Sequence, residues 1–297
     1  MTRLFVLGNA SIDVSLRVPH LPQPGETLMA SDLTHAPGGK GLNQAVVAAR
    51  AGAAVRFCAP IGTSPDAAML RETLAAEPLE VVRLTPVPTV CDISALVVAA
   101  DAENVVVSTG ACAMALPVTS AAAFLAEIAA GDLLLMQGGL SQEATRKAAL
   151  LARACGARVL LNAAPVRWDY AELLGLVDLV VANQVEATDL TGHEDPAAAA
   201  TALRTAGAAE SIVTLGGGGC VLADGAGVRL YPAPPAEACD TSGAGDVFCG
   251  VLAAALAAGH AHPVAAAQQA AALSVARAGC FVSFPSSAEL QHILATA

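Results

Sequence analysis

The stretch Asp240-Thr241-Ser242-Gly243-Ala244-Gly245-Asp246 decides how this chain is interpreted, and a long apolar segment that ends at Gly259 follows it. That segment is rich in residues that favour helix, and a glycine suits its C-terminal end. The helix should therefore begin near Gly243, where backbone N–H groups lack intrahelical acceptors and the helix dipole favours an anion. Glycine also lets a phosphate approach the backbone closely.

Asp246 lies at the same helix start, so a carboxylate is expected beside an anion site. This pairing suits phosphoryl transfer. The N–H groups of Gly243, Ala244, Gly245 and Asp246 would stabilise the moving phosphoryl group, while Asp246 would accept the proton of an attacking hydroxyl. The alternative is a glycine-rich turn with an acidic residue placed for the helix dipole. A second glycine-rich segment, Gly38-Gly39-Lys40-Gly41-Leu42-Asn43-Gln44-Ala45, favours the functional interpretation.

The two stretches resemble the C-terminal and N-terminal signatures of the ribokinase-like sugar kinases, also called the phosphofructokinase-B family. Their separation matches that family, and the resemblance covers nearly all 297 residues. It implies an α/β fold: a three-layer sandwich with a mostly parallel central sheet and a small β lid, in a single kinase domain over 1–297.

The activity that the resemblance implies is ATP-dependent phosphorylation of a sugar hydroxyl, with ribose as the first candidate. A nucleoside kinase for adenosine or pseudouridine, or another free-sugar kinase, is the alternative within the same fold. A non-catalytic sugar or nucleotide sensor belongs to a different class, but it would lack the base that Asp246 provides. A dinucleotide-dependent oxidoreductase is excluded because no GxGxxG follows the first strand.

Composition limits the partners. The net charge of −11 argues against nucleic acid and anionic membranes, which select basic surfaces. No segment reaches about 18 uninterrupted apolar residues, so we expect no membrane span. The start of the chain has a strand pattern instead of a signal peptide. The eight cysteines form no CxxC pair, which indicates reduced thiols in a cytoplasmic protein.

Periodicity predicts alternating strands and helices along most of the chain. Continuously apolar strands favour a parallel sheet that is covered on both faces. The expected strands are 3–8, 54–59, 132–136, 157–161, 177–182, 211–215 and 219–223; the expected helices are 41–51, 65–76, 119–130, 141–155, 196–206, 244–258, 263–278 and 286–295. Residues 14–36 and 91–109 contain β-like pieces without following helices, joined in the second case by a turn at Asp101-Ala102-Glu103. They are expected to form one small sheet, which the resemblance identifies as a lid over the sugar and a homodimer contact.

Two segments are candidates for binding the sugar. Asp13 follows the first strand at the end where ligands bind in open α/β sheets, although a turn aspartate is the simpler explanation. In the second segment, the glycines permit close approach of a ligand, and Asn43 can both donate and accept hydrogen bonds. The resemblance assigns sugar binding to Asp13, Gly39 and Asn43, and we add the adjacent Lys40.

Nucleotide and metal residues are expected further along the chain. Asn183 and Glu186 fit a capping box, and the resemblance also gives them a role toward phosphate and Mg²⁺. It places ATP contacts near Thr214, Gly216 and Gly219, and we add Gln268 as a candidate for the adenine. A potassium site is implied at the loop of Gly279 and Ser283, with Asp240 as a side-chain ligand.

The stretch Met136-Gln137-Gly138-Gly139-Leu140-Ser141-Gln142 departs from the pattern of the family. Gly139 stands where the resemblance implies a glutamate that binds the sugar. Either Gln137, Gln142 or a water fills the gap and ribose still binds, or the added space accepts a larger or less hydroxylated sugar. The identity of the sugar therefore stays open at this stage.

Overall fold

The strands form two sheets across residues 2–101 and 103–297, which are the residues that the computed structural model describes. The large sheet has nine strands in the order β13-β12-β11-β10-β9-β8-β1-β4-β5. Its strands are β1 (Arg3–Leu7), β4 (Ala54–Ile61), β5 (Val81–Pro86), β8 (Leu133–Gln137), β9 (Arg158–Asn162), β10 (Leu179–Asn183), β11 (Glu210–Thr214), β12 (Cys220–Asp224) and β13 (Gly227–Tyr231). Pairing is parallel from β5 to β11 and antiparallel from β11 to β13.

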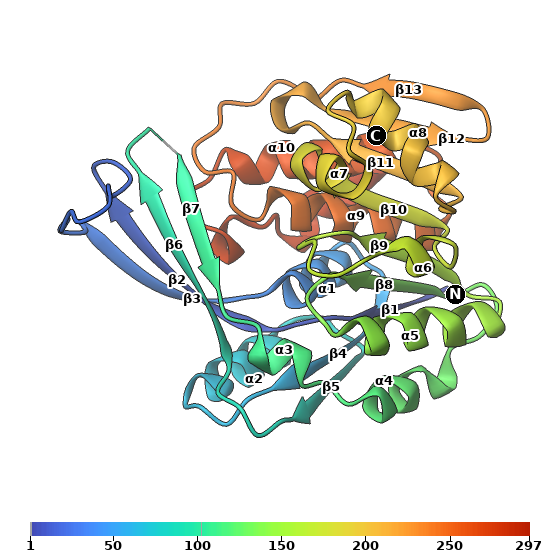
Figure 1. Ribbon diagram of the computed structural model, residues 1–297, viewed down its shortest axis with the longest axis horizontal. Helices are drawn as coiled ribbons and strands as arrows, with labels where there is room; N and C mark the ends of the chain where they lie inside the picture. The colour runs from blue at the N-terminus through green and yellow to red at the C-terminus, as the bar shows by residue number, and fades with distance from the viewer. Residues whose placement is uncertain (1, 102) are drawn as a thin grey trace.

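Helices cover both faces of the large sheet, which gives three layers (Figure 1). Side chains of β1 alternate between the two cores: Leu4 and Val6 face one, and Phe5 and Leu7 face the other. The first core takes α1 (Lys40–Arg50), α2 (Asp66–Ala76), α9 (Ala244–Ala258), α10 (Pro263–Val275) and α11 (Ser287–Thr296). The second takes α3 (Ala111–Met114), α4 (Val118–Phe124), α5 (Gln142–Ala154), α6 (Ala171–Leu174), α7 (Gln184–Thr191) and α8 (Pro196–Thr205).

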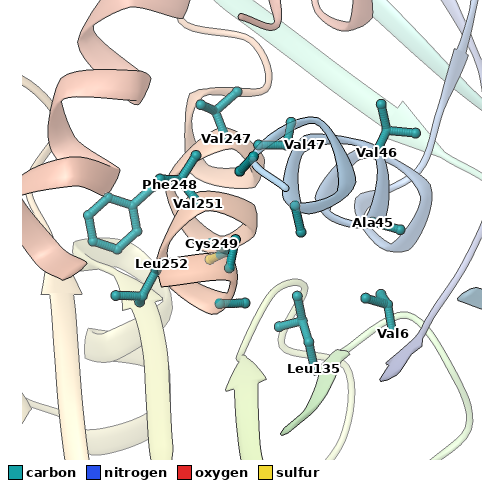
Figure 2. Packing of buried hydrophobic residues seen from close by; sticks show 14 of the residues in the cluster. Val6, Ala45, Val46, Val47, Leu135, Val247, Phe248, Cys249, Val251 and Leu252 are labelled. Atoms are coloured by element: carbon teal, nitrogen blue, oxygen red, sulfur yellow. The ribbon is translucent and has the colours of Figure 1, made fainter. Parts of the chain in front are cut away.

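Helices α1 and α9 carry the two glycine-rich stretches and pack against each other. Figure 2 shows Val47 of α1 beside Val247 and Val251 of α9, above the strand residues Val6 and Leu135. All of these side chains are fully buried. This apolar contact fixes the starts of the two helices relative to one another.

The small sheet contains both segments that were expected to lie outside the parallel sheet. Its order is β3-β2-β6-β7, formed by β2 (Ser11–Val18), β3 (Asp32–Gly38), β6 (Asp92–Ala99) and β7 (Asn104–Ser108). It projects from one side of the α/β body (Figure 1). Ala102, within the expected turn, lies outside the described residues.

The predicted fold class is confirmed, and several element boundaries need correction. The expected helix 119–130 is shorter, because α4 ends at Phe124 and a 3₁₀ turn follows at Leu125–Glu127. Strand β2 begins at Ser11, so Asp13 lies within a strand and not in a turn. No helix among residues 2–101 and 103–297 is long and apolar enough to cross a membrane.

Candidate active site

The start of α9 has the open geometry that an anion site needs. Gly243 precedes the helix with φ of 79°, and a Cβ there would lie 2.7 Å from Cys280 Sγ. The Asp246 N–H donates to Gly243 O at 2.9 Å, and the Ala244 N–H donates to Thr241 O at 3.3 Å. Within the described chain the Gly245 N–H has no acceptor, and a Cβ on Gly245 would meet no atom within 4 Å. Among the four predicted N–H groups of the described chain, those of Gly243 and Gly245 have no acceptor, and Gly245 also has open space beside its Cα for an anion.

The glycines before α1 allow a different close approach from the one expected. Gly39 has φ of 93°, and its missing Cβ leaves room for the Ser11 N–H and Ala10 Cα at about 3 Å. A Cβ on Gly41 would lie 2.5 Å from the backbone nitrogen of Asn9. These glycines let α1 pack onto the chain between β1 and β2. Gly39 and Gly41 are thus required by this packing, and the role of Gly39 toward the sugar stays a prediction.

Asn43 and Lys40 bring α1 to the carboxylate of Asp246. Asn43 Nδ2 donates to Asp246 Oδ2 at 2.9 Å, and both side chains are buried. Asn43 Oδ1 is buried and has no hydrogen-bond partner in the described chain. Asp246 raises the pKa of the Lys40 ammonium, and Glu186 adds to the effect. The charges of Asp246 and Glu186 therefore favour the protonated form of Lys40.

Three buried amides form a second group around Asp246 that the sequence did not single out as one unit. Gln44 Nε2 donates to Asp246 Oδ1 at 2.9 Å and to Asn162 Oδ1 at 3.0 Å. Gln137 Nε2 donates to Gln44 Oε1 at 2.8 Å. Gln44 adjoins Asn43 in sequence, and Gln137 and Asn162 end neighbouring strands, which is the signal that could have identified them.

Asp13 lies on β2 and faces the same region. It is buried against Gly38, where a Cβ would lie 2.2 Å from the carboxyl carbon. Burial, together with the negative charge of Asp246, raises the pKa of Asp13 to about 7. The charge of Lys40 opposes this shift. Asp13 can therefore accept or donate hydrogen bonds to hydroxyl groups near neutral pH.

Asn183 and Glu186 form the capping box that their spacing predicts. Asn183 Oδ1 accepts from the Glu186 N–H at 2.8 Å, and Glu186 Oε2 accepts from the Asn183 N–H at 2.9 Å. Burial raises the pKa of Glu186. Glu186 Oε1 is not used by the cap, so one oxygen is left for a cation or its water.

Asp240 joins the loop before α9 to the loop before α11. Its two oxygens accept from the Ser242 N–H at 2.9 Å and from the Gly279 N–H at 3.0 Å. Arg17 of β2 lies 3.7 Å from the second oxygen. Ser283 Oγ donates to Cys280 O at 2.7 Å, which holds this loop in a tight turn. Of the three residues expected at a potassium site, Asp240 and Gly279 are in direct contact, and Ser283 is joined to the same loop through Cys280.

The residues expected at the nucleotide divide into two groups. Thr214 ends β11 directly beside Asn183 of β10, and Gly216 begins an open 3₁₀ turn after it. Gly219, in contrast, is required by the hairpin, because a Cβ there would lie 2.0 Å from Tyr231 O. Gln268 is buried and donates to Tyr231 O at 2.8 Å. Its role toward adenine stays a prediction.

Gly139 leaves room for a side chain. A Cβ there would meet only Asn9, at an ordinary contact distance of 3.5 Å. Gln142 donates to Asp169 O at 3.2 Å on the surface, and Gln137 is engaged with Gln44. In this structure, neither glutamine extends its amide over Gly139.

A buried carboxylate beside an open helix start, at the carboxyl ends of parallel strands, defines a phosphotransferase that acts on an alcohol. The model of the pfkB family of carbohydrate kinases matches residues 1–287, and the chain belongs to that family. The recognition made from the two signatures is therefore confirmed, and the protein is an ATP-dependent carbohydrate kinase.

Relatives and solved structures agree over the full length. The chain is 33% identical to ribokinase of Haemophilus influenzae over 299 residues, covering 98% of each protein. It matches the crystal structure of ribokinase from Thermotoga maritima with a TM-score of 0.87 and 28% identity, over 100% of both chains. It also matches Arabidopsis thaliana ribokinase in complex with ribose and ATP, with a TM-score of 0.84, 25% identity and complete coverage of both chains.

Proposed function

We propose that this protein phosphorylates ribose with ATP and thus acts as a ribokinase. The observation that carries the proposal is the pairing of Asp246 with Asn43, whose buried Oδ1 has no partner in the described chain. A buried amide oxygen needs a hydrogen-bond donor. A sugar hydroxyl would supply that donor and would lie beside the carboxylate that deprotonates it.

The relatives support ribose as the substrate. The Haemophilus influenzae relative is a ribokinase, and the Arabidopsis thaliana structure contains ribose and ATP. In the proposed reaction the hydroxyl oxygen attacks the γ-phosphorus as its proton passes to Asp246, and the bond to the ADP oxygen breaks. The Gly245 N–H and the Lys40 ammonium would stabilise the charge on the moving phosphoryl group. Asp13, Gly39 and Asn43 would position the sugar.

Magnesium fits near Glu186. Its free Oε1 would hold Mg²⁺ through water, because this ion keeps much of its hydration and is completed by substrate phosphates. The ion would neutralise phosphate charge. The described residues contain no cluster of three or more His, Cys, Asp or Glu, which is consistent with a site that ATP completes.

Potassium would bind at the loops that Asp240 joins, with Gly279 and Ser283 contributing. Each oxygen of Asp240 accepts one N–H, and Arg17 lies 3.7 Å from Oδ2, so Oδ1 is the oxygen that retains a lone pair for potassium. We also infer that the protein works in the cytoplasm, where ATP is present and its eight free cysteines stay reduced.

The small sheet would serve as the lid over the sugar and as the contact of a homodimer. Its edge strand β7 exposes Val105 and Val107 on one face, and Ile93 of the neighbouring β6 and Leu33 of the opposite edge strand β3 are also exposed. A second copy would cover this apolar surface.

A substrate panel tests the proposed function. We expect ribose to give the highest kcat/KM among ribose, deoxyribose, fructose, adenosine and pseudouridine, measured as ADP release with ATP and Mg²⁺. If a competitor exceeds ribose by about a hundredfold, which is about 2.7 kcal/mol in transition-state binding, ribose is the wrong substrate. The room beside Gly139 makes deoxyribose and fructose the most informative competitors.

A further inference from the structure

Each carboxylate oxygen of Asp246 accepts a hydrogen bond from a buried amide. One of these two amides is not placed to bind ATP or sugar. Asn43 donates to one carboxylate oxygen, and Gln44 donates to the other, each at 2.9 Å. Gln44 has no exposed surface, so it cannot contact substrate. We propose that Gln44 is the positioning residue that orients Asp246 for proton transfer, and that Gln137 and Asn162 hold Gln44 in the one amide orientation that permits it. This inference rests on the proposed function only in that Asp246 accepts a proton.

The orientation follows from counting donors and acceptors. Both protons of the Gln44 amide nitrogen are used, one toward Asp246 Oδ1 and one toward Asn162 Oδ1. Its oxygen accepts from the Gln137 amide. A flipped Gln44 would point its oxygen at two acceptors and its nitrogen at a donor, so three contacts would become repulsive.

A backbone carbonyl fixes which end of each linked amide donates and which accepts, from Asn162 through Gln44 to Gln137. Asn162 Nδ2 donates to Val181 O of β10 at 3.2 Å, so Asn162 Oδ1 must face Gln44. Gln137 and Asn162 end β8 and β9 and are partners in the sheet register. The parallel sheet therefore sets the position of the Gln44 amide, which in turn sets the rotation of the Asp246 carboxylate.

The arrangement leaves each Asp246 oxygen with one lone-pair site after it has accepted an amide proton. A substrate hydroxyl can use only those remaining sites, so the approach of the attacking oxygen is restricted. Proton transfer and in-line attack both depend on such restriction, and a misplacement of about 1 Å can cost about a hundredfold in rate.

Gln44→Met is the main test, because methionine has a similar length and shape but cannot donate. We expect kcat to fall by about 10-fold to 100-fold, with the KM for sugar and ATP changing by less than about threefold. One donor to the ionised carboxylate is lost, so the acidic limb of the kcat/KM profile should move to higher pH. A merely structural role would lower the active fraction or the Tm without moving that limb.

Other titratable groups also act on Asp246 and stay in place in this variant. They are Asp13 of β2, Lys40 of α1, Glu186 of α7, Cys249 of α9 and Cys280 before α11. Gln44→Glu should move the limb further than Gln44→Met, because it places a second carboxylate against Asp246.

Gln137→Met removes one of the two amides that orient Gln44 and leaves Gln44 itself unchanged, so it serves if the Gln44 variants fail to fold. It should lower kcat in the same direction but less. Ser211→Ala is the matched control: this buried hydroxyl donates to Ala200 O of α8 and has no hydrogen bond to the amides around Asp246, so the variant should keep kcat. In the Asp246→Asn background, Gln44→Met should have no further effect on kcat.

An unchanged acidic limb with kcat within about twofold of wild type would overturn the proposal, as would additive effects in the double variant. Failure of the proposed function, ribose phosphorylation, would give a result distinct from failure of the Gln44 proposal. In that case ribose is a poor substrate, and the same variants can be assayed with whichever sugar the enzyme accepts.

Discussion

Asp246 is the proposed proton acceptor, and its replacement has a specific expected cost. Asp246→Asn removes the proton acceptor and turns one acceptor into a donor that faces the Asn43 or Gln44 amide. We expect turnover to fall by about a hundredfold or more, the usual scale for a lost general base, while nucleotide still binds. Steady-state rates with ribose, together with ATP titration by calorimetry, check this. Near-wild-type turnover would remove Asp246 from the mechanism.

Asp13 predicts a trade between stability and function. Its pKa of about 7 lies above the ordinary value, because burial and Asp246 disfavour the charged form. Between the ordinary pKa of 3.8 and the folded-state pKa of about 7, the folded state therefore binds more protons than the unfolded state. The contribution of Asp13 to stability is fully present below about pH 4 and is lost as the pH rises through about 7.

Asp13→Asn should therefore raise the free energy of unfolding at pH 8 by about 1 kcal/mol or more relative to wild type, and by much less at pH 4.5. It should also weaken sugar binding. Urea unfolding at the two pH values measures the difference. Asp32→Asn, which changes an exposed carboxylate on β3, is the control and should give the same change at both. A stabilisation that does not depend on pH would contradict the burial argument.

At the scale of the element, two glycines at the start of α9 do opposite things. Gly243 has a positive φ, and a methyl group there would meet Cys280 Sγ at 2.7 Å and Phe284 Cε1 at 2.8 Å. Gly243→Ala should cost about 1–3 kcal/mol of stability. Gly245→Ala enters open space within the helix and should leave the Tm equal or higher. Its methyl group would stand at the phosphate, so kcat should fall by about tenfold or more. Thermal unfolding and kinetics of both variants test this contrast, which reversed outcomes would refute.

The predictable elements are the ones with continuous apolar runs. The central strands β1, β8 and β10 were expected because both of their faces are buried. Strands β5 and β13 lie at the two edges of the large sheet, are largely exposed, and were not predicted. Asp246 and Asn43 could be identified from glycine-rich motifs. Gln44 and Asn162 could be noticed as a neighbour of Asn43 and as a residue at a strand end. Their contact with each other depends on strand order and on the packing of α1 against α9, which the sequence does not give.

At the scale of the whole molecule, an edge strand from each sheet offers a test of the proposed dimer: β7 of the small sheet and β13 of the large sheet. Val107 of β7 is 68% exposed and Leu230 of β13 is 63% exposed. Val107→Lys should convert a dimer into a monomer by placing charge in an apolar contact, whereas Leu230→Lys should leave the dimer intact. Sedimentation velocity separates the two states. A wild-type monomer, or a dimer broken only by Leu230→Lys, would exclude the small sheet as the interface.

The two carboxylates of the site belong to different bodies: Asp13 lies on the small sheet and Asp246 on the α/β body. A sugar held by both would use part of its binding energy to bring them together. Discrimination among sugars should then appear in the rate of the committed complex as well as in affinity. An analogue that lacks the hydroxyl bound by Asp13 would saturate the enzyme and still turn over slowly. The enzyme would therefore phosphorylate competing sugars slowly even when their concentrations are high.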